Sequence, residues 1–98
     1  MLVNIIKSCR TIVTICDSDL LGKTFEQGKG QLNIKESFYK GEEKTPEQVE
    51  EIIKGFIQED ATFNIVGKES TDLALKIGMI TQEGIKEVQG VPFALILL

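Results

Sequence analysis

The chain has 98 residues, of which 42% are hydrophobic and 27% charged, and it carries a formal net charge of −4 with no histidine. This composition is typical of a globular protein with one core and excludes a disordered chain. Its longest apolar stretch is far shorter than the roughly 20 residues of a membrane-spanning helix, and its amino terminus lacks the order of a signal peptide. We therefore expect a single domain over residues 1–98, cytoplasmic and without membrane contact.

The absence of histidine excludes several classes of chemistry. Ser-His-Asp and Cys-His pairs, histidine general bases and His-containing metal sites all require an imidazole. Two cysteines are also too few for a Cys₄ zinc site. Carboxylate, lysine, tyrosine and thiol chemistry remain, so whether the chain is an enzyme stays open, and no cofactor or metal is expected.

The charges are divided unevenly along the chain. Residues 1–44 carry seven Lys/Arg against six Asp/Glu, whereas residues 45–98 carry four against nine. A protein that binds duplex nucleic acid would show a clear basic excess. A local basic face in the first half is still compatible with these counts.

The first predicted elements form a β-hairpin. Leu2–Lys7 and Thr11–Cys16 are β-rich runs separated by a short turn that contains Cys9. Cys16 lies near the end of the second strand, about 23 Å from Cys9 at the usual strand rise, which is too far for a disulfide. We expect two reduced thiols, as in cytosolic proteins.

Turns and short strands follow the hairpin. Residues 17–22 predict a turn or a single helical turn, and Lys23–Glu26 an extended segment. The glycines at 28 and 30 mark another turn. Gln31–Phe38 is then predicted to be a strand.

The next part of the chain shows the clearest helix signal. Thr45, Pro46 and Gln48 form the capping-box pattern at the start of a helix that we expect to end near Gln58. Its apolar stripe consists of Val49, Ile52, Ile53, Phe56 and Ile57.

A strand at Thr62–Val66 leads into a second helix at about Lys68–Ile77, with Leu73, Ala74 and Ile77 buried and Gly78 as a left-handed C-cap. Ile85–Val88 and Phe93–Leu97 are predicted to be closing strands, joined by a bend at residues 90–92. Together these elements predict an α+β fold: a mixed, mostly antiparallel sheet of five or six strands with two main helices.

The acidic turn after the hairpin is the first candidate site. Asp17 and Asp19 could bind Mg²⁺ with a substrate phosphate, since paired carboxylates are a usual magnesium environment. Lys23 belongs to the same candidate site, and Cys16 could act as a nucleophile if a lysine lowered its pKa. The structural interpretation, which we favour, is that an aspartate caps the turn and Cys16 is a buried thiol.

The second candidate site is a run of lysines interleaved with aromatic residues. Its members are Lys23, Phe25, Lys29, Lys35, Phe38, Tyr39, Lys40 and Lys44. Such a surface resembles a binding site for single-stranded RNA, with aromatic rings stacking on bases and lysines contacting phosphates. The four glutamates in this stretch and the alternative that the aromatic rings belong to the core both weigh against it.

Four segments in order resemble an archaeal family of small proteins, the domain of unknown function 424. They are Cys16-Asp17 with Leu20-Leu21-Gly22-Lys23-Thr24-Phe25, Glu36-Ser37-Phe38-Tyr39-Lys40-Gly41-Glu42, Asn64-Ile65-Val66-Gly67-Lys68-Glu69, and Gly90-Val91-Pro92-Phe93-Ala94. The resemblance implies an archaeal, intracellular, single-domain protein and no established activity, cofactor or catalytic residue. The family's last motif usually carries histidine after the proline, where this chain has Phe93, so an imidazole role cannot apply there.

Three functional hypotheses follow. The leading one is a non-catalytic binding or accessory module for RNA or for protein complexes of information processing. The second is a small enzyme or a metal- or nucleotide-binding protein that uses Asp17, Asp19 and Lys23. The third is a structural homo-oligomer joined through the exposed edge of the apolar C-terminal strand.

Overall fold

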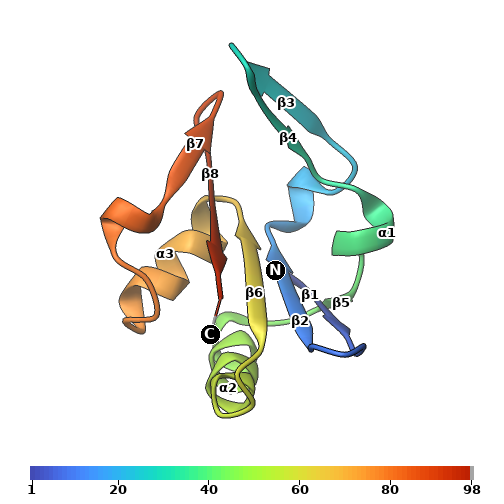
Figure 1. The fold of residues 1–98 in the computed structure, drawn as a ribbon, viewed down its shortest axis with the longest axis vertical. Helices are drawn as coiled ribbons and strands as arrows, with labels where there is room; N and C mark the ends of the chain where they lie inside the picture. Colours follow the sequence, from blue (N-terminus) through green and yellow to red (C-terminus); the bar gives the residue numbers. More distant parts are fainter. Residues whose placement is uncertain (98) are drawn as a thin grey trace.

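A six-stranded mixed sheet forms the centre of the molecule (Figure 1). The computed structural model describes residues 1–97. The strand order across the sheet is β5-β1-β2-β6-β8-β7, with bounds β1 Leu2–Ile6, β2 Ile12–Cys16, β5 Glu42–Glu43, β6 Thr62–Val66, β7 Lys86–Val88 and β8 Val91–Ile96. Only β2 and β6 run parallel, and the other pairs are antiparallel. The predicted α+β fold and its mostly antiparallel sheet are confirmed.

Two helices cover one face of this sheet. They are α2, Pro46–Ile57, and α3, Lys68–Lys76. The predicted capping box starts α2: the Gln48 amide donates to Thr45 Oγ1 at 3.2 Å, and the Thr45 amide donates to Gln48 Oε1 at 2.9 Å. Ile57 is 38% exposed, so its predicted place in the apolar stripe is wrong.

The helix face holds the larger core cluster. Its buried members are Val3, Val13, Ile15, Val49, Ile53, Ala61, Phe63, Ile65, Leu73 and Ala74. Helix α3 ends as predicted at Gly78, whose φ is +79°. The Met79 amide donates to the Ala74 carbonyl at 3.0 Å and the Gly78 amide to the Leu75 carbonyl at 3.1 Å, which together form a Schellman motif.

The opposite face is covered over part of its area by a small hairpin and one helical turn. The hairpin consists of β3, Thr24–Gln27, and β4, Gly30–Asn33, and the helical turn is α1, Glu36–Tyr39. They enclose a second core cluster with Cys16, Leu32, Ile34, Tyr39, Val66 and Val88 as its buried members. A 3-10 turn, η1, at Ser18–Leu20 precedes the hairpin.

The predicted strand Gln31–Phe38 is wrong in its second half. The chain leaves the strand after Asn33 and forms α1. Phe38 and Tyr39 both pack into the second core cluster, with ring centroids 5.0 Å apart and an edge-to-face arrangement. Neighbours in a strand would point to opposite faces, so two adjacent aromatic residues can enter one core only if the backbone turns.

The last hairpin turns one residue earlier than expected. Gln89 and Gly90 have φ of +50° and +78° and lie between the paired residues Val88 and Val91. Two central residues with positive φ are the mark of a type I′ turn. Strand β8 therefore begins at Val91 and includes Pro92. A second 3-10 turn, η2, at Gln82–Gly84 leads into β7. No helix in residues 1–97 is both long and apolar enough to cross a membrane.

Candidate functional site

Asp17 lies at the carboxyl end of β2 and caps the amino terminus of α3. Its Oδ2 accepts a hydrogen bond from the Glu69 amide at 3.0 Å, and its Oδ1 accepts from the Ser70 amide at 2.9 Å and the Ser70 hydroxyl at 2.7 Å. Residue 67, the N-cap position itself, is a glycine and has no side chain to do this. Asp17 therefore supplies from another strand the anion that a helix amino terminus favours.

Gly67 makes this contact possible. Its φ is +107°, and a Cβ there would overlap the carboxyl group of Asp17. The Gly67 amide also donates to the Pro92 carbonyl at 2.8 Å, which ties β8 to the same point. The capping role that we favoured for an aspartate is thus directed at α3 and not at the turn after β2, since Asp17 makes no side-chain hydrogen bond to η1.

A small hollow of about 190 Å³ lies beside this carboxylate. Its lining consists of Asp17, Asp19, Leu20, Lys68, Gly90, Val91 and Pro92. The structure therefore brings Asp17 and Asp19 together with Lys68, whereas Lys23 does not line the hollow. Within residues 1–97, no three His, Cys, Asp or Glu side chains are grouped so as to hold a metal ion.

The thiol and the phenol near this region are both buried. Burial raises the pKa of the Cys16 thiol to about 12, and the negative charges of Asp17 and Asp19 add to the rise. Burial, followed by the nearby Cys16, also raises the pKa of Tyr39. Both groups are therefore neutral at physiological pH, and a neutral thiol is a poor nucleophile.

The lysine-rich segment forms an exposed prominence on this acidic protein. Lys23, Lys29, Lys35 and Lys40 are exposed, and none of them forms an ion pair within the described residues. By contrast, Glu42 pairs with Lys44 at 2.9 Å and Glu43 pairs with the amino-terminal ammonium group. These hydrogen bonds lower the pKa of both carboxyl groups.

The aromatic residues of this segment do not form a stacking surface. Tyr39 is only 8% exposed, and Phe25 and Phe38 are half-buried against the second core cluster. The structure therefore leaves the lysines exposed and turns the aromatic rings inward. A base could stack on Tyr39 only if the core opened.

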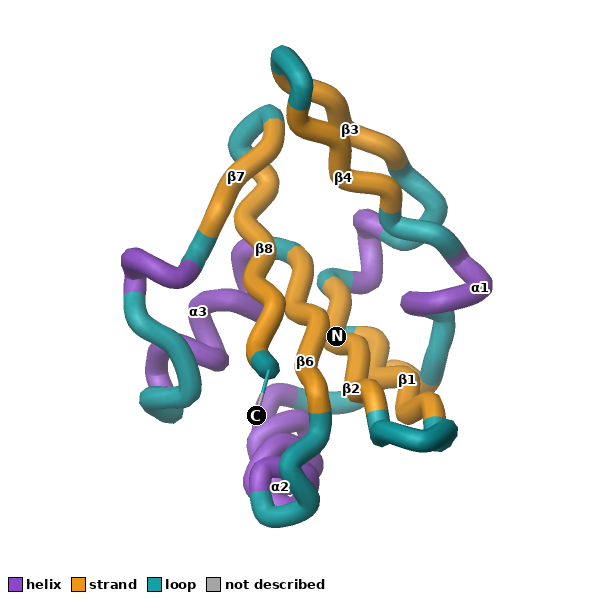
Figure 2. Tube along the Cα trace, viewed as in Figure 1, coloured by secondary structure: helices purple, strands orange, loops and turns teal. Residues whose placement is uncertain are grey.

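A strand edge without a neighbouring strand lies on β8, beyond the end of β7. Strand β7 pairs with β8 only as far as Phe93, opposite Lys86. Past this point, no described strand covers that side of β8. Figure 2 shows that no helix lies in front of the lower part of β6 and β8 either.

The direction of the backbone groups on β8 follows from the antiparallel pattern. Pro92 bonds to Gly67 on the β6 side, and in an antiparallel pair alternate residues point their N–H and C=O groups to opposite sides. Ala94 and Ile96 therefore face β6, whereas Leu95 faces outward. The same alternation, continued one residue past the last paired residue, Ile96, directs Leu97 outward as well. We call residues 94–97, with the outward groups of Leu95 and Leu97, the β8 edge.

Two side chains of the β8 edge, those of Leu95 and Leu97, are also open. Leu95 is 58% exposed and Leu97 is 70% exposed, the two highest values among the large hydrophobic residues described. A hollow of about 340 Å³ adjoins Leu95, and its other lining residues are Gly84, Lys86, Phe93 and Ala94. On the same face, the buried Thr62 hydroxyl has no hydrogen-bond partner among the described residues.

Sequence reasoning found this strand but not its exposed residues. The apolar run Val91–Leu98 shows a strand, and the structure shows which of its residues a neighbour covers. Only the short length of β7 and the register of the β7–β8 pair expose Leu95 and Leu97. Hydrophobic periodicity reveals neither the length of β7 nor the register of this pair.

Comparison with known proteins gives a family and one structural relative. A model of the family described as "Protein of unknown function (DUF424)" matches residues 6–98. A crystal structure of an uncharacterized conserved protein from Methanopyrus kandleri is similar, with a TM-score of 0.85 and 27% identity over 97% of this chain and 88% of that one. No curated protein matches the sequence.

Proposed function

The chain belongs to the DUF424 family of proteins of unknown function, and we propose that it is a non-catalytic module that binds protein through the β8 edge. The observation that carries this proposal is the coincidence of exposed leucine side chains and outward backbone groups at Leu95 and Leu97. Isolated exposed leucines are ordinary on protein surfaces, but an apolar, unpaired strand edge is a pairing site for another chain.

Strand addition suits the chemistry of this edge. An incoming extended segment would bond to the outward N–H and C=O groups of Leu95 and Leu97, and its alternate side chains would cover the two leucines. Natural proteins protect exposed edges with lysine, proline or a bulge. Residues 94–97 contain none of these charges or prolines, so the edge is not protected against pairing.

The reactive groups support a role without catalysis. Both carboxylate oxygens of Asp17 are engaged at α3, and burial keeps Cys16 and Tyr39 neutral. A catalytic acid, base or nucleophile needs a pKa close to the working pH and access to a substrate. Cys16 and Tyr39 do not meet the first condition, and the carboxylate oxygens of Asp17 are already engaged by the Glu69 amide and by Ser70.

Protein is favoured over RNA as the partner because of charge and burial. The stretch from Lys23 to Lys40 contains two glutamates besides its four exposed lysines, and the whole chain is acidic. Single-strand binding relies on both a basic groove and aromatic stacking, and Tyr39 is buried. Two free thiols accord with a cytoplasmic location, which forms part of the same proposal.

The test compares two matched double variants with the wild type. Leu95→Lys with Leu97→Lys blocks the β8 edge, and Lys29→Glu with Lys40→Glu reverses the charge of the lysine-rich segment. All four positions are exposed, so each pair should change stability by no more than about 1 kcal/mol. Tagged proteins would be used for affinity purification from an archaeal lysate, with and without RNase.

We expect the wild type and the lysine variant to capture the same protein, with or without RNase, and the leucine variant to lose it. Capture that survives in the leucine variant contradicts the proposal. Capture that disappears with RNase or in the lysine variant assigns the function to RNA instead.

A further inference from the structure

We infer that the strand which occupies the β8 edge is the β8 edge of a second copy of this chain, an inference that rests on the proposed function. The two copies pair antiparallel about a two-fold axis that passes beside Ile96. Leu95 of each copy then lies opposite Leu97 of the other.

The hydrogen-bond pattern of β8 permits this pairing. An antiparallel hydrogen-bonded pair needs two residues that both point their backbone groups toward the neighbour. Leu95 points outward, because Pro92 faces β6 and the direction alternates along the strand, and the alternation continued one residue past β8 gives Leu97 the same direction. A two-fold axis at Ile96 therefore matches outward residues with outward residues on both sides of the axis.

The same symmetry gathers the exposed leucines. Leu95 and Leu97 are two residues apart and so lie on one face of β8. Pairing Leu95 with Leu97 of the second copy places all the leucines of both edges side by side on that face. This covers the two most exposed large apolar side chains described in the molecule, at 58% and 70%.

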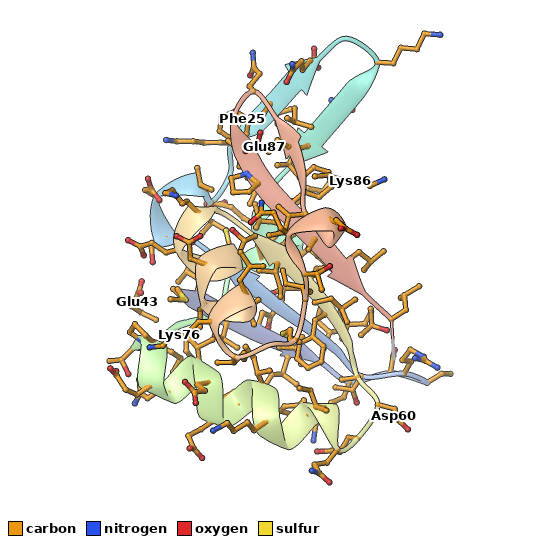
Figure 3. The ribbon with its side chains drawn as sticks, turned by 90° about the vertical axis from the view of Figure 1, so that its left-hand side faces the viewer. Phe25, Glu43, Asp60, Lys76, Lys86 and Glu87 are labelled. Atoms are coloured by element: carbon orange, nitrogen blue, oxygen red, sulfur yellow. The ribbon has the colours of Figure 1, made fainter. Side chains whose placement is uncertain are left out.

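Charges at the two ends of the edge are complementary under this symmetry. Figure 3 looks onto this side of the molecule and shows Lys86 above and Asp60 below the free part of β8. Neither side chain forms an ion pair within the described residues. The two-fold axis between them brings Lys86 of each copy toward Asp60 of the other, so two attractive pairs flank the leucines.

The length of β7 fits the same arrangement. Strand β7 stops at Lys86, opposite Phe93, so a second β8 can lie in line with β7 along the rest of the strand. One short strand pair buries much less than the roughly 1,600 Å² of a standard stable interface. The dimer should therefore be reversible and depend on protein concentration.

Analytical ultracentrifugation of the purified protein over a wide concentration range tests the inference. The wild type should pass from monomer to dimer as concentration rises, and Leu95→Lys with Leu97→Lys should stay monomeric. Lys86→Glu and Asp60→Lys should each weaken the dimer about three- to tenfold, as expected for rim ion pairs turned into repulsion. The combined charge swap should restore it to within about twofold.

Lys29→Glu is the control for a change of net charge, because Lys29 lies at the tip of the β3–β4 hairpin, and it should leave the dimer unchanged. Circular dichroism and urea unfolding would establish that each variant is folded. A wild type that stays monomeric at millimolar concentration, a dimer that survives in the leucine variant, or a charge swap without restoration overturns the inference. A monomeric wild type whose captured protein is lost only in the leucine variant overturns self-pairing and leaves the proposed function standing.

Discussion

At the scale of single residues, Asp17 joins the two halves of the chain. Its carboxylate accepts hydrogen bonds from the Glu69 amide, 52 residues further along, and from the buried Ser70. We expect Asp17→Ala to lower the free energy of unfolding by about 2–4 kcal/mol, because it removes a cap and leaves a buried amide and hydroxyl without a partner.

Urea unfolding would measure this loss, with Asp19→Ala as the matched control. Asp19 is exposed and makes no hydrogen bond to α3, so its replacement should change stability by about 0.5 kcal/mol or less. Equal losses in the two variants would show that Asp17 does not cap α3 in solution.

The two thiols should differ sharply in reactivity. Cys9 is exposed and Cys16 is buried, and the pKa of Cys16 is raised to about 12. Because the thiolate is the reactive form, an alkylating reagent at pH 8 should modify one thiol per native chain quickly and two per denatured chain. Mass spectrometry would locate the modified residue, and rapid modification of Cys16 in the native protein would contradict its burial.

At the scale of elements, the capping box of α2 provides a prediction about stability. Thr45→Ala removes the hydroxyl that accepts from the Gln48 amide and should destabilise the protein by about 0.5–2 kcal/mol. Thr81→Ala should cost less, because Thr81 precedes a 3-10 turn and makes no side-chain cap hydrogen bond. Urea midpoints with unchanged m-values would compare the two variants, and the reverse order would refute the role of Thr45.

Local signals predicted the elements that depend on local physics. The capping residues of α2, the strand Thr62–Val66 and the glycine cap at Gly78 follow from patterns within a few residues. The strand predicted at Gln31–Phe38 is wrong in its second half. There the chain forms α1, which lets the adjacent side chains of Phe38 and Tyr39 pack into the same core cluster. The core that these two side chains enter is built partly from sheet strands distant in sequence, so a stretch of neighbouring residues does not reveal it.

At the scale of the whole molecule, the candidate site depends on contacts distant in sequence. Asp17 stands out in the sequence as a possible ligand, but its partners at Glu69 and Ser70 come from the other half of the chain. The openness of Leu95 depends on where β7 stops. The sequence therefore indicated a C-terminal strand with an exposed edge, and only the assembled sheet identified the residues that are open.

The backbone groups of Leu95 and Leu97 should be free in the isolated molecule and become paired on binding. Amide hydrogen exchange followed by NMR measures this directly, residue by residue. In dilute protein, the amides of Leu95 and Leu97 should exchange quickly, while those of Ala94 and Ile96, which face β6, should exchange slowly. Raising the protein concentration or adding the captured partner should slow amide exchange at Leu95 and Leu97 and leave the exchange rates of Ala94 and Ile96 unchanged. Amides of Leu95 and Leu97 that are already as protected as their neighbours in dilute monomer, or that stay unprotected in the complex, would contradict strand pairing at the β8 edge.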